Sequence, residues 1–185
     1  KEAGEGPWAA VCPLPCRALP AWAAAHGMRS VCHPADLGAW LGDRSNYLTA
    51  FRRLGLPVLA GRWLTLTGAR YSELASEMGS CFVVQQKGGC GGSGTHFVHT
   101  AKDLATAAHS VGSTTVWVAP ELDGPSFNIN AIALDRQAVA GCPSLQLSGL
   151  AEIRARRGTY CGNDFLSAGA FGSGVLEDIR EQTDQ

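Results

Sequence analysis

A glycine-rich run between two apolar stretches constrains this chain more than any other feature. Five of the seven residues from 88 to 94 are glycine, and apolar, mostly β-branched or aromatic residues flank the run at 82–84 and 97–98. This pattern is typical of two strands joined by a hairpin. Because glycine has no Cβ, the N–H groups of such a loop can converge on an anion, and phosphates are often held in this way. The run therefore predicts a hairpin that holds a phosphate-containing ligand, with a nucleotide as the first ligand to expect.

Three other phosphate loops can be compared with this run. Residues 89–94 satisfy G-x-G-x-x-G, but a dinucleotide fold needs a helix to start there, and residues 95–98 read as a strand. A P-loop needs Lys where this chain has Thr95. The glycine loop of protein kinases is also a hairpin, but no H-R-D or D-F-G motif follows. A hairpin that folds over ATP remains, beside the alternative of a surface hairpin without a ligand.

Four segments in a fixed order extend the pattern over roughly residues 40 to 135. Residues 41–58 contain Asp43 and Arg44, then an amphipathic helix that Asp43 or Ser45 can cap, and then Gly-Leu-Pro-Val. The glycine run follows, with a short helix after it that Thr100 can cap. Residues 114–124 predict a strand and linker, and residues 125–134 predict one long strand. Together these segments resemble the ATP-grasp superfamily.

This resemblance implies a fold and a division of the chain. The fold class is α/β (α+β), with an antiparallel sheet and a glycine-rich hairpin closing over ATP. Residues 1–40, with a strand near 8–12 and a helix near 20–26, are expected to be the end of a small pre-ATP-grasp α/β domain. Residues 41–185 are expected to form the ATP-grasp domain, incomplete at its C-terminus.

The resemblance also assigns roles to individual residues. In the family, the basic residue after the Asp reaches the phosphates, and that residue is Arg44 here. A Lys on the strand entering the loop also contacts phosphate, but this chain has the neutral Gln85. Lys87, expected on the same strand face, is the candidate to replace that charge, so Arg44 and Lys87 are the predicted catalytic residues. The predicted nucleotide contacts are Arg44, Gln85, Lys87, Gly89, Gly91, Gly92, Ser93, Gly94, Ala119, Pro120, Glu121 and Leu122.

Two departures from the family pattern affect the ends of this site. The family usually has a Glu five residues before the Gly of the linker, and this chain has Ala119, so adenine recognition is expected to rest on main-chain groups around Glu121 and on Leu122. The family binds magnesium through a Glu or Asp and then a Glu-x-Asn, which residues 134–185 do not contain. No metal ligand is therefore predicted in this chain, and Asp164 with Asn163 is expected to form a turn.

The resemblance implies an ATP-dependent ligase that joins a carboxylate to an amine through an acyl-phosphate, with ATP and Mg²⁺ as cofactors. The Mg²⁺ ligands are expected outside this segment. Two alternatives remain open. One is a non-catalytic nucleotide-binding or regulatory module, which the substitutions at Gln85 and Ala119 favour; the other is a small-molecule kinase with the same hairpin. The missing magnesium motif and the absent initiator Met also lead us to expect a piece of a longer chain.

Composition limits the classes of partner that this chain is expected to bind. With 185 residues and 45% hydrophobic content, the chain can bury a core, and a formal net charge of −1 gives no general basic field, so nucleic acid is not an expected partner. No run approaches the roughly 18 consecutive apolar residues of a membrane span, so a membrane is not expected either. A homo-oligomer stays open. The seven cysteines show no C-x-x-C spacing and are expected to be mostly buried thiols of a cytoplasmic protein, apart from a Cys90 that nucleotide would protect if exposed. His96, His99 and the arginines at 154, 156 and 157 are expected to be mainly solvated, although the arginines could attract a substrate carboxylate.

Overall fold

The computed structural model describes residues 8–12, 16–32, 34–134 and 137–184, without the side chains of 133–134, 137 and 182–184. The chain divides into two compact units, which are described separately. The first contains Lys1–Ala60 and Gln86–Gly88, and the second contains Gly61–Gln85 and Gly89–Gln185. The division at residue 40 that the resemblance implies stays a prediction. None of the described helices is both long and apolar enough to cross a bilayer.

The first unit begins with a β-α-β element, as expected. Strand β1 (Ala9–Val11) pairs in parallel with β2 (Arg29–Val31), and α1 (Leu19–Ala25) connects them. Helices α2 (Ala35–Gly42) and α3 (Arg44–Arg53) follow. The cap predicted for the second of these is confirmed for Asp43, whose carboxylate accepts a hydrogen bond from the backbone N–H of Ser45 at 2.8 Å. Hydrogen bonds from the Ser45 side chain and backbone lower the pKa of Asp43 below its ordinary value.

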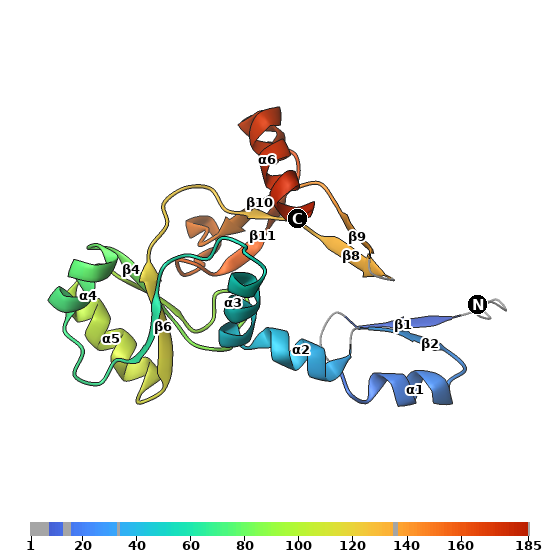
Figure 1. Cartoon of the computed structure of the whole chain (residues 1–185), viewed down its shortest axis with the longest axis horizontal. Helices are drawn as coiled ribbons and strands as arrows, with labels where there is room; N and C mark the ends of the chain where they lie inside the picture. Colours follow the sequence, from blue (N-terminus) through green and yellow to red (C-terminus); the bar gives the residue numbers. More distant parts are fainter. Residues whose placement is uncertain (1–7, 13–15, 33, 135–136, 185) are drawn as a thin grey trace. The chain divides into compact units, whose positions relative to one another are not determined.

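The second unit is built on a four-stranded antiparallel sheet in the order β3-β6-β4-β5. Its strands are β3 (Arg62–Thr65), β4 (Phe82–Gln85), β5 (Thr95–Val98) and β6 (Thr115–Pro120). Helices α4 (Tyr71–Met78) and α5 (Ala101–Val111) lie against the sheet (Figure 1). Their apolar residues form the main core with alternate strand residues, namely Leu66, Leu74, Phe82, Val84, Val98, Leu104, Ala107, Val111, Val116 and Val118. The two helices therefore cover one face of the sheet, and the opposite face can pack against the rest of the unit.

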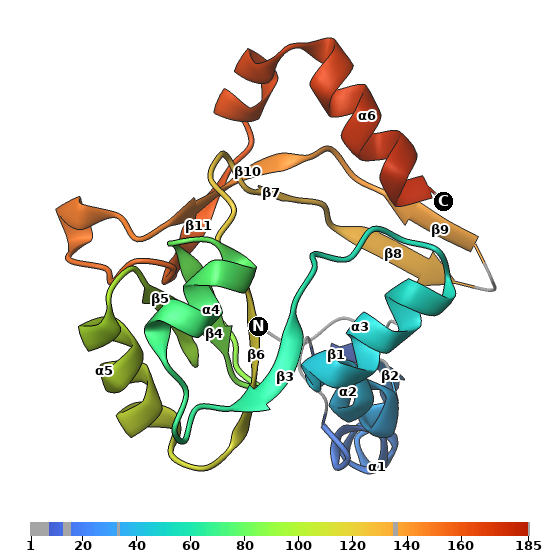
Figure 2. The same ribbon diagram turned by 60° about the vertical axis from the view of Figure 1, so that its left-hand side comes forward.

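A second sheet follows in the order β11-β10-β7. It contains β7 (Phe127–Asn128), β10 (Ser144–Ser148) and β11 (Tyr160–Asp164), all antiparallel. Strands β8 (Ala131–Leu134) and β9 (Gln137–Ala140) form a separate hairpin, and α6 (Ser173–Asp184) packs on β9 (Figure 2). Two 3₁₀ turns, η1 (Ala151–Ile153) and η2 (Ser167–Phe171), flank β11.

The prediction of one long strand over residues 125–134 is wrong. The segment breaks into β7, which pairs with β10, and β8, which pairs with β9. At the break the carbonyl of Asn130 accepts a hydrogen bond from the N–H of Gly141 at 2.8 Å. A change of pairing partner along a strand is not visible in a local sequence pattern.

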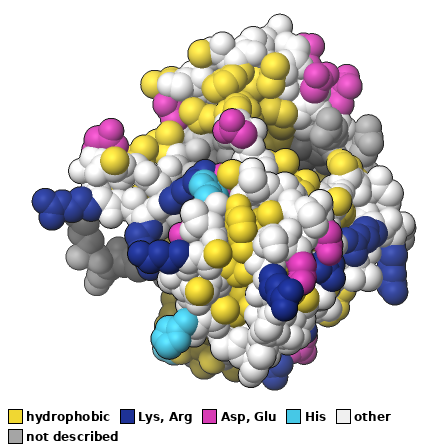
Figure 3. All heavy atoms as spheres, turned by 90° about the vertical axis from the view of Figure 1, so that its left-hand side faces the viewer, with side chains coloured by type: hydrophobic (Ala, Val, Ile, Leu, Met, Phe, Trp, Pro, Cys, Tyr) yellow, Lys and Arg dark blue, Asp and Glu magenta, His cyan; other side chains and the backbone are white. Residues whose placement is uncertain are grey.

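The surface of the second unit carries mixed charge. On the face drawn in Figure 3, basic and acidic side chains are interspersed with apolar ones, in keeping with the near-zero net charge. An exposed example is the pair of Arg62 and Glu77 at 3.0 Å. Such pairs contribute little to stability.

Candidate functional site

The predicted hairpin is present as β4 and β5. Their register runs from Phe82 opposite Val98 to Gln85 opposite Thr95, and β4 also pairs with β6 on its other side. Because Phe82 and Val84 are buried in the core, Val83 and Gln85 point to the opposite face. The Gln85 amide donates to the Thr95 hydroxyl at 3.4 Å. Gln85, which stands where the family has Lys, therefore belongs to the last residue pair of β4 and β5 before the glycine loop. Its side chain bonds to the opposite strand.

The glycine loop is a compact turn held by Ser93. The Ser93 hydroxyl donates to the Cys90 carbonyl at 2.8 Å and accepts from the Cys90 N–H at 3.1 Å, and the Ser93 N–H bonds to the same carbonyl at 3.0 Å. A nucleotide contact by the Ser93 hydroxyl, as predicted, would have to exchange with these bonds. The loop adopts the positive φ angles that favour glycine at Gly89, Gly91, Gly92 and Gly94.

The loop is fastened to the segment that leads into β11. The Tyr160 N–H donates to the Gly91 carbonyl at 3.1 Å. A Cβ at Gly92 would lie 2.0 Å from the carbonyl oxygen of Gly158, and a Cβ at Gly158 would lie 2.7 Å from the ring of Phe97. Both positions need glycine because backbone meets backbone or an aromatic ring there. The tip of the hairpin is therefore held in one arrangement within its unit.

In the first unit, the structure brings the two predicted cationic residues together. The Arg44 N–H donates to the Lys87 carbonyl at 2.8 Å, and the Arg44 guanidinium donates to the Gln86 carbonyl at 3.4 Å and to the Tyr47 hydroxyl at 2.6 Å. The expectation that Lys87 shares a strand face with Gln85 is wrong. Strand β4 ends at Gln85, and the backbone beyond it bonds to Arg44 instead of to a neighbouring strand.

The predicted linker follows β6. Ala119 is 1% exposed and lies opposite Val83 in the sheet. The Glu121 N–H donates to the Cys81 carbonyl at 3.1 Å, so this main-chain donor already extends the sheet. Leu122 is 72% exposed and is free to pack on a ligand, as its predicted role requires. The part of Pro120 in that contact stays a prediction.

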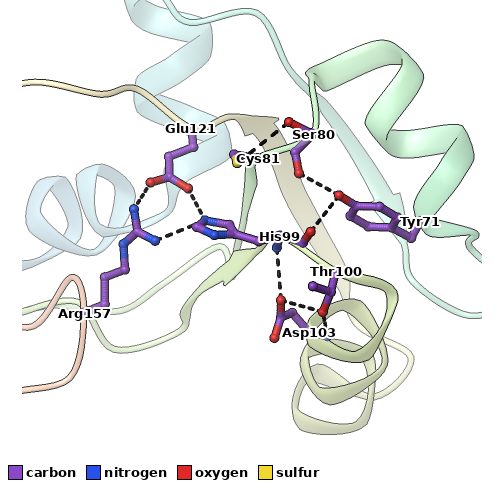
Figure 4. Close-up of polar contacts among 8 residues, drawn as sticks. All are labelled: Tyr71, Ser80, Cys81, His99, Thr100, Asp103, Glu121 and Arg157. Carbon is purple, nitrogen blue, oxygen red and sulfur yellow. Dashed lines mark hydrogen bonds and ion pairs between the residues drawn. The ribbon is translucent and has the colours of Figure 1, made fainter.

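Sequence reasoning missed a cluster at the same end of the sheet (Figure 4). The Glu121 side chain is only 11% exposed; one carboxylate oxygen lies 2.7 Å from His99 Nε2, and the other is bonded to the Arg157 guanidinium. Arg157 also lies 3.1 Å from His99 Nε2 and 4.5 Å from the centre of the Phe97 ring. His99 and Arg157 are exposed, as expected of surface residues, but the sequence did not predict that both would contact Glu121.

The cysteines also differ from expectation, because Cys81, Cys90 and Cys142 are exposed and the other four are half-buried. The turn expected at Asn163 and Asp164 is displaced, because both residues pair in β11 and only the residues after Asp164 turn. The Asp164 carboxylate accepts from the N–H groups of Leu166 and Ser167, both at 2.9 Å, and bonds from Ser167 lower its pKa.

No family model matches this sequence, and no curated protein matches it. Solved structures do match. D-alanyl-alanine synthetase A from Vibrio cholerae matches with a TM-score of 0.62 and 15% identity over 88% of this chain and 51% of its own. A carboxyaminoimidazole ribonucleotide synthase from Aspergillus clavatus, complexed with ATP, matches with a TM-score of 0.68 and 9% identity over 95% and 45%. A biotin carboxylase from Campylobacter jejuni matches with a TM-score of 0.63 and 17% identity over 89% and 38%.

These similarities bear on the fold. The chain spans about half the length of these structures or less, and the sequence identities are low. The matched enzymes are ATP-grasp proteins, so the predicted mixed α/β, ATP-grasp fold with antiparallel sheets is confirmed.

Proposed function

We propose that this chain binds ATP at the glycine hairpin and provides the nucleotide-binding part of a ligase that joins a carboxylate to an amine. The observation that carries the proposal is an ATP-grasp fold in which a glycine-rich tip joins β4 to β5 while β4 pairs in register with β6, the strand before the linker. The solved structure from Aspergillus clavatus that shares this fold is complexed with ATP, which supports the choice of nucleotide.

The residues present fit a triphosphate. Glycines at 89, 91, 92 and 94 leave the loop backbone accessible, and Arg44 and Lys87 are adjacent cationic residues. Their role would be to bind the phosphates and to neutralise charge that develops during transfer, since catalysis of phosphoryl transfer is mostly positioning and electrostatic stabilisation. The exposed Leu122 would pack on the base.

The proposed reaction has two steps. A carboxylate oxygen of the acid attacks the γ-phosphorus of ATP, the bond from that phosphorus to the ADP oxygen breaks, and an acyl-phosphate forms. The amine nitrogen then attacks the acyl carbon, the carbon–oxygen bond to phosphate breaks, and the nitrogen loses a proton. Magnesium would supply charge neutralisation on the phosphates, with ligands that we place outside this segment, because the carboxylate of Asp164 already serves two backbone N–H groups.

Calorimetric titration with MgATP tests the binding. Because Lys87 is taken to replace the charge missing at Gln85, Lys87→Ala should weaken binding about tenfold and Gln85→Ala only about threefold. Lys102→Ala, at an exposed position of helix α5, is the matched control and should leave binding unchanged. The opposite order of the first two variants would refute the compensation, and a wild-type chain that binds no ATP would refute the function.

A second candidate function is a non-catalytic nucleotide-binding module. It is favoured by Ala119, which is buried where the family has Glu, and by the neutral Gln85. Product analysis separates the candidates. In a chain extended to include the Mg²⁺ ligands, ADP and an amide formed only when acid and amine are both present identify the ligase, a phosphate ester identifies a kinase, and binding without turnover identifies the module.

A further inference from the structure

The end of the hairpin opposite the glycine tip gathers three side chains with metal-ligand chemistry. They are Cys81, His99 and Glu121, and the thiol sulfur, an imidazole nitrogen and a carboxylate oxygen all lie within 4.8 Å of one another. Figure 4 shows the three side chains converging, with Arg157 on the far side of the carboxylate. None of the three is predicted to bind phosphate, although the main chain of Glu121 is a predicted adenine contact.

The register of the sheet explains the convergence. Phe82 pairs with Val98 on one side and with Pro120 on the other, so the residues one step beyond this row lie at the ends of three adjacent strands. Phe82 and Val98 are fully buried in the core. Because side chains alternate along a strand, Cys81 and His99 point to the opposite face.

The backbone around the cluster is fastened at several points. The Glu121 N–H donates to the Cys81 carbonyl at 3.1 Å. The Tyr71 hydroxyl lies 2.8 Å from both the Ser80 and the His99 carbonyl oxygens, and the His99 N–H donates to Asp103 at 3.2 Å. A donor set with a fixed backbone loses little freedom when it takes up an ion, which favours binding.

We propose that Cys81 Sγ, His99 Nε2 and one Glu121 carboxylate oxygen bind a single Zn²⁺ ion. A thiolate, an imidazole and a carboxylate are the ligand types that zinc takes in proteins, and three of them leave a fourth position for water. The thiol proton passes to solvent when the ion binds. Arg157 keeps its bond to the second carboxylate oxygen, which orients the ligand, and gives up its 3.1 Å contact with the ring nitrogen to the metal.

Cobalt titration tests this site without any nucleotide, so its outcome is independent of the proposed function. Wild-type chain, reduced and then freed of reductant, should bind one Co²⁺ with a thiolate-to-cobalt absorption band, and Zn²⁺ should displace it. Cys81→Ser should abolish the band and weaken Zn²⁺ binding at least tenfold. Cys90→Ser is the matched control, since it removes another exposed thiol from the same hairpin and should change neither readout.

A second variant tests the site without removing the thiol. His99→Gln leaves the thiol in place and should weaken Zn²⁺ binding at least tenfold while the band, if cobalt is forced on at high concentration, shifts in position. Circular dichroism of each metal-free variant verifies that it is folded. Wild-type chain without saturable binding, a band that survives Cys81→Ser, or a band lost in Cys90→Ser would each overturn the site.

Discussion

The two ends of the hairpin formed by β4 and β5 depend on opposite structural features. At the tip, the function that we propose depends on the lack of side chains, and the six residues from Gly89 to Gly94 are contiguous in sequence. At the base, the cluster depends on polar side chains, and its members Cys81, His99 and Glu121 come from three strand ends. A contiguous feature can be recognised from composition alone, whereas one assembled by strand register cannot.

The difference extends to what holds each end in place. The tip is fixed by backbone contacts with the start of β11 and the segment before it, such as the bond from Tyr160 to the Gly91 carbonyl. The base is fixed by an ion pair from Arg157 and a hydrogen bond with His99 around the nearly buried carboxylate of Glu121. Substitutions that add bulk should therefore damage the tip, and substitutions that remove charge should damage the base.

The largest expected effect is at the tip, in a comparison of two neighbouring glycines. Gly91 and Gly92 both have positive φ, but a Cβ at Gly91 meets nothing within 4 Å, while one at Gly92 would lie 2.0 Å from the Gly158 oxygen. Gly91→Ala should lower the free energy of unfolding by about 1 kcal/mol, from backbone strain alone. Gly92→Ala should cost about 3 kcal/mol, because backbone must also move. Urea unfolding measures both, and equal losses would show that the tip does not pack on Gly158.

The parts of the fold that sequence predicted correctly are local in origin. The hairpin follows from β-branched residues on both sides of a glycine run, and the caps at Asp43 and Thr100 are short-range hydrogen bonds that the structure contains. The fold as a whole was predicted from the resemblance to the ATP-grasp superfamily, which rests on four such segments in a fixed order.

The parts that failed depend on partners distant in sequence. The strand predicted over residues 125–134 breaks because its halves pair with different strands, and Lys87 leaves the sheet because pairing ends at Gln85. His99 is exposed as expected, but its contact with Arg157 was not predicted, because nothing near it in sequence indicates a residue 58 positions away. Knowledge of the register opposite Phe82 would have been enough to bring His99 and Glu121 together.

The second largest expected effect is at the base of the hairpin, where a substitution removes a charge. Glu121→Gln should lower the free energy of unfolding by about 1.5 kcal/mol, since a nearly buried carboxylate loses its charge-assisted bonds to Arg157 and His99. Glu77→Gln is the matched control, because its pair with Arg62 is about half exposed and should contribute about 0.5 kcal/mol or less. Urea unfolding at neutral pH compares the two, and equal losses would mean that the base cluster is no stronger than a surface pair.

The two exposed thiols of the hairpin report on its two ends at once. Cys90 is at the tip and Cys81 at the base. MgATP should slow alkylation of Cys90 about tenfold, whereas Zn²⁺ should slow alkylation of Cys81 by a similar factor and leave Cys90 unaffected. Peptide mapping after iodoacetamide treatment resolves the two sites. Protection of Cys90 by Zn²⁺ would show that the metal does not bind at the base alone.

The smallest expected effect is in the middle of the hairpin, where neither the lack of side chains nor the pairing of charges dominates. His96 lies in β5 opposite Val84, and burial of its imidazole, followed by the charge of Arg156, lowers its pKa below the ordinary value of 6.5. The unfolded chain therefore takes up this proton first as the pH falls through 6.5, so stability that is present above that pH declines below it. His96→Gln should therefore reduce the decline of the free energy of unfolding between pH 7 and 5, measured by urea unfolding at both pH values. An unchanged decline in His96→Gln would mean that this imidazole does not contribute to the acid sensitivity of the chain.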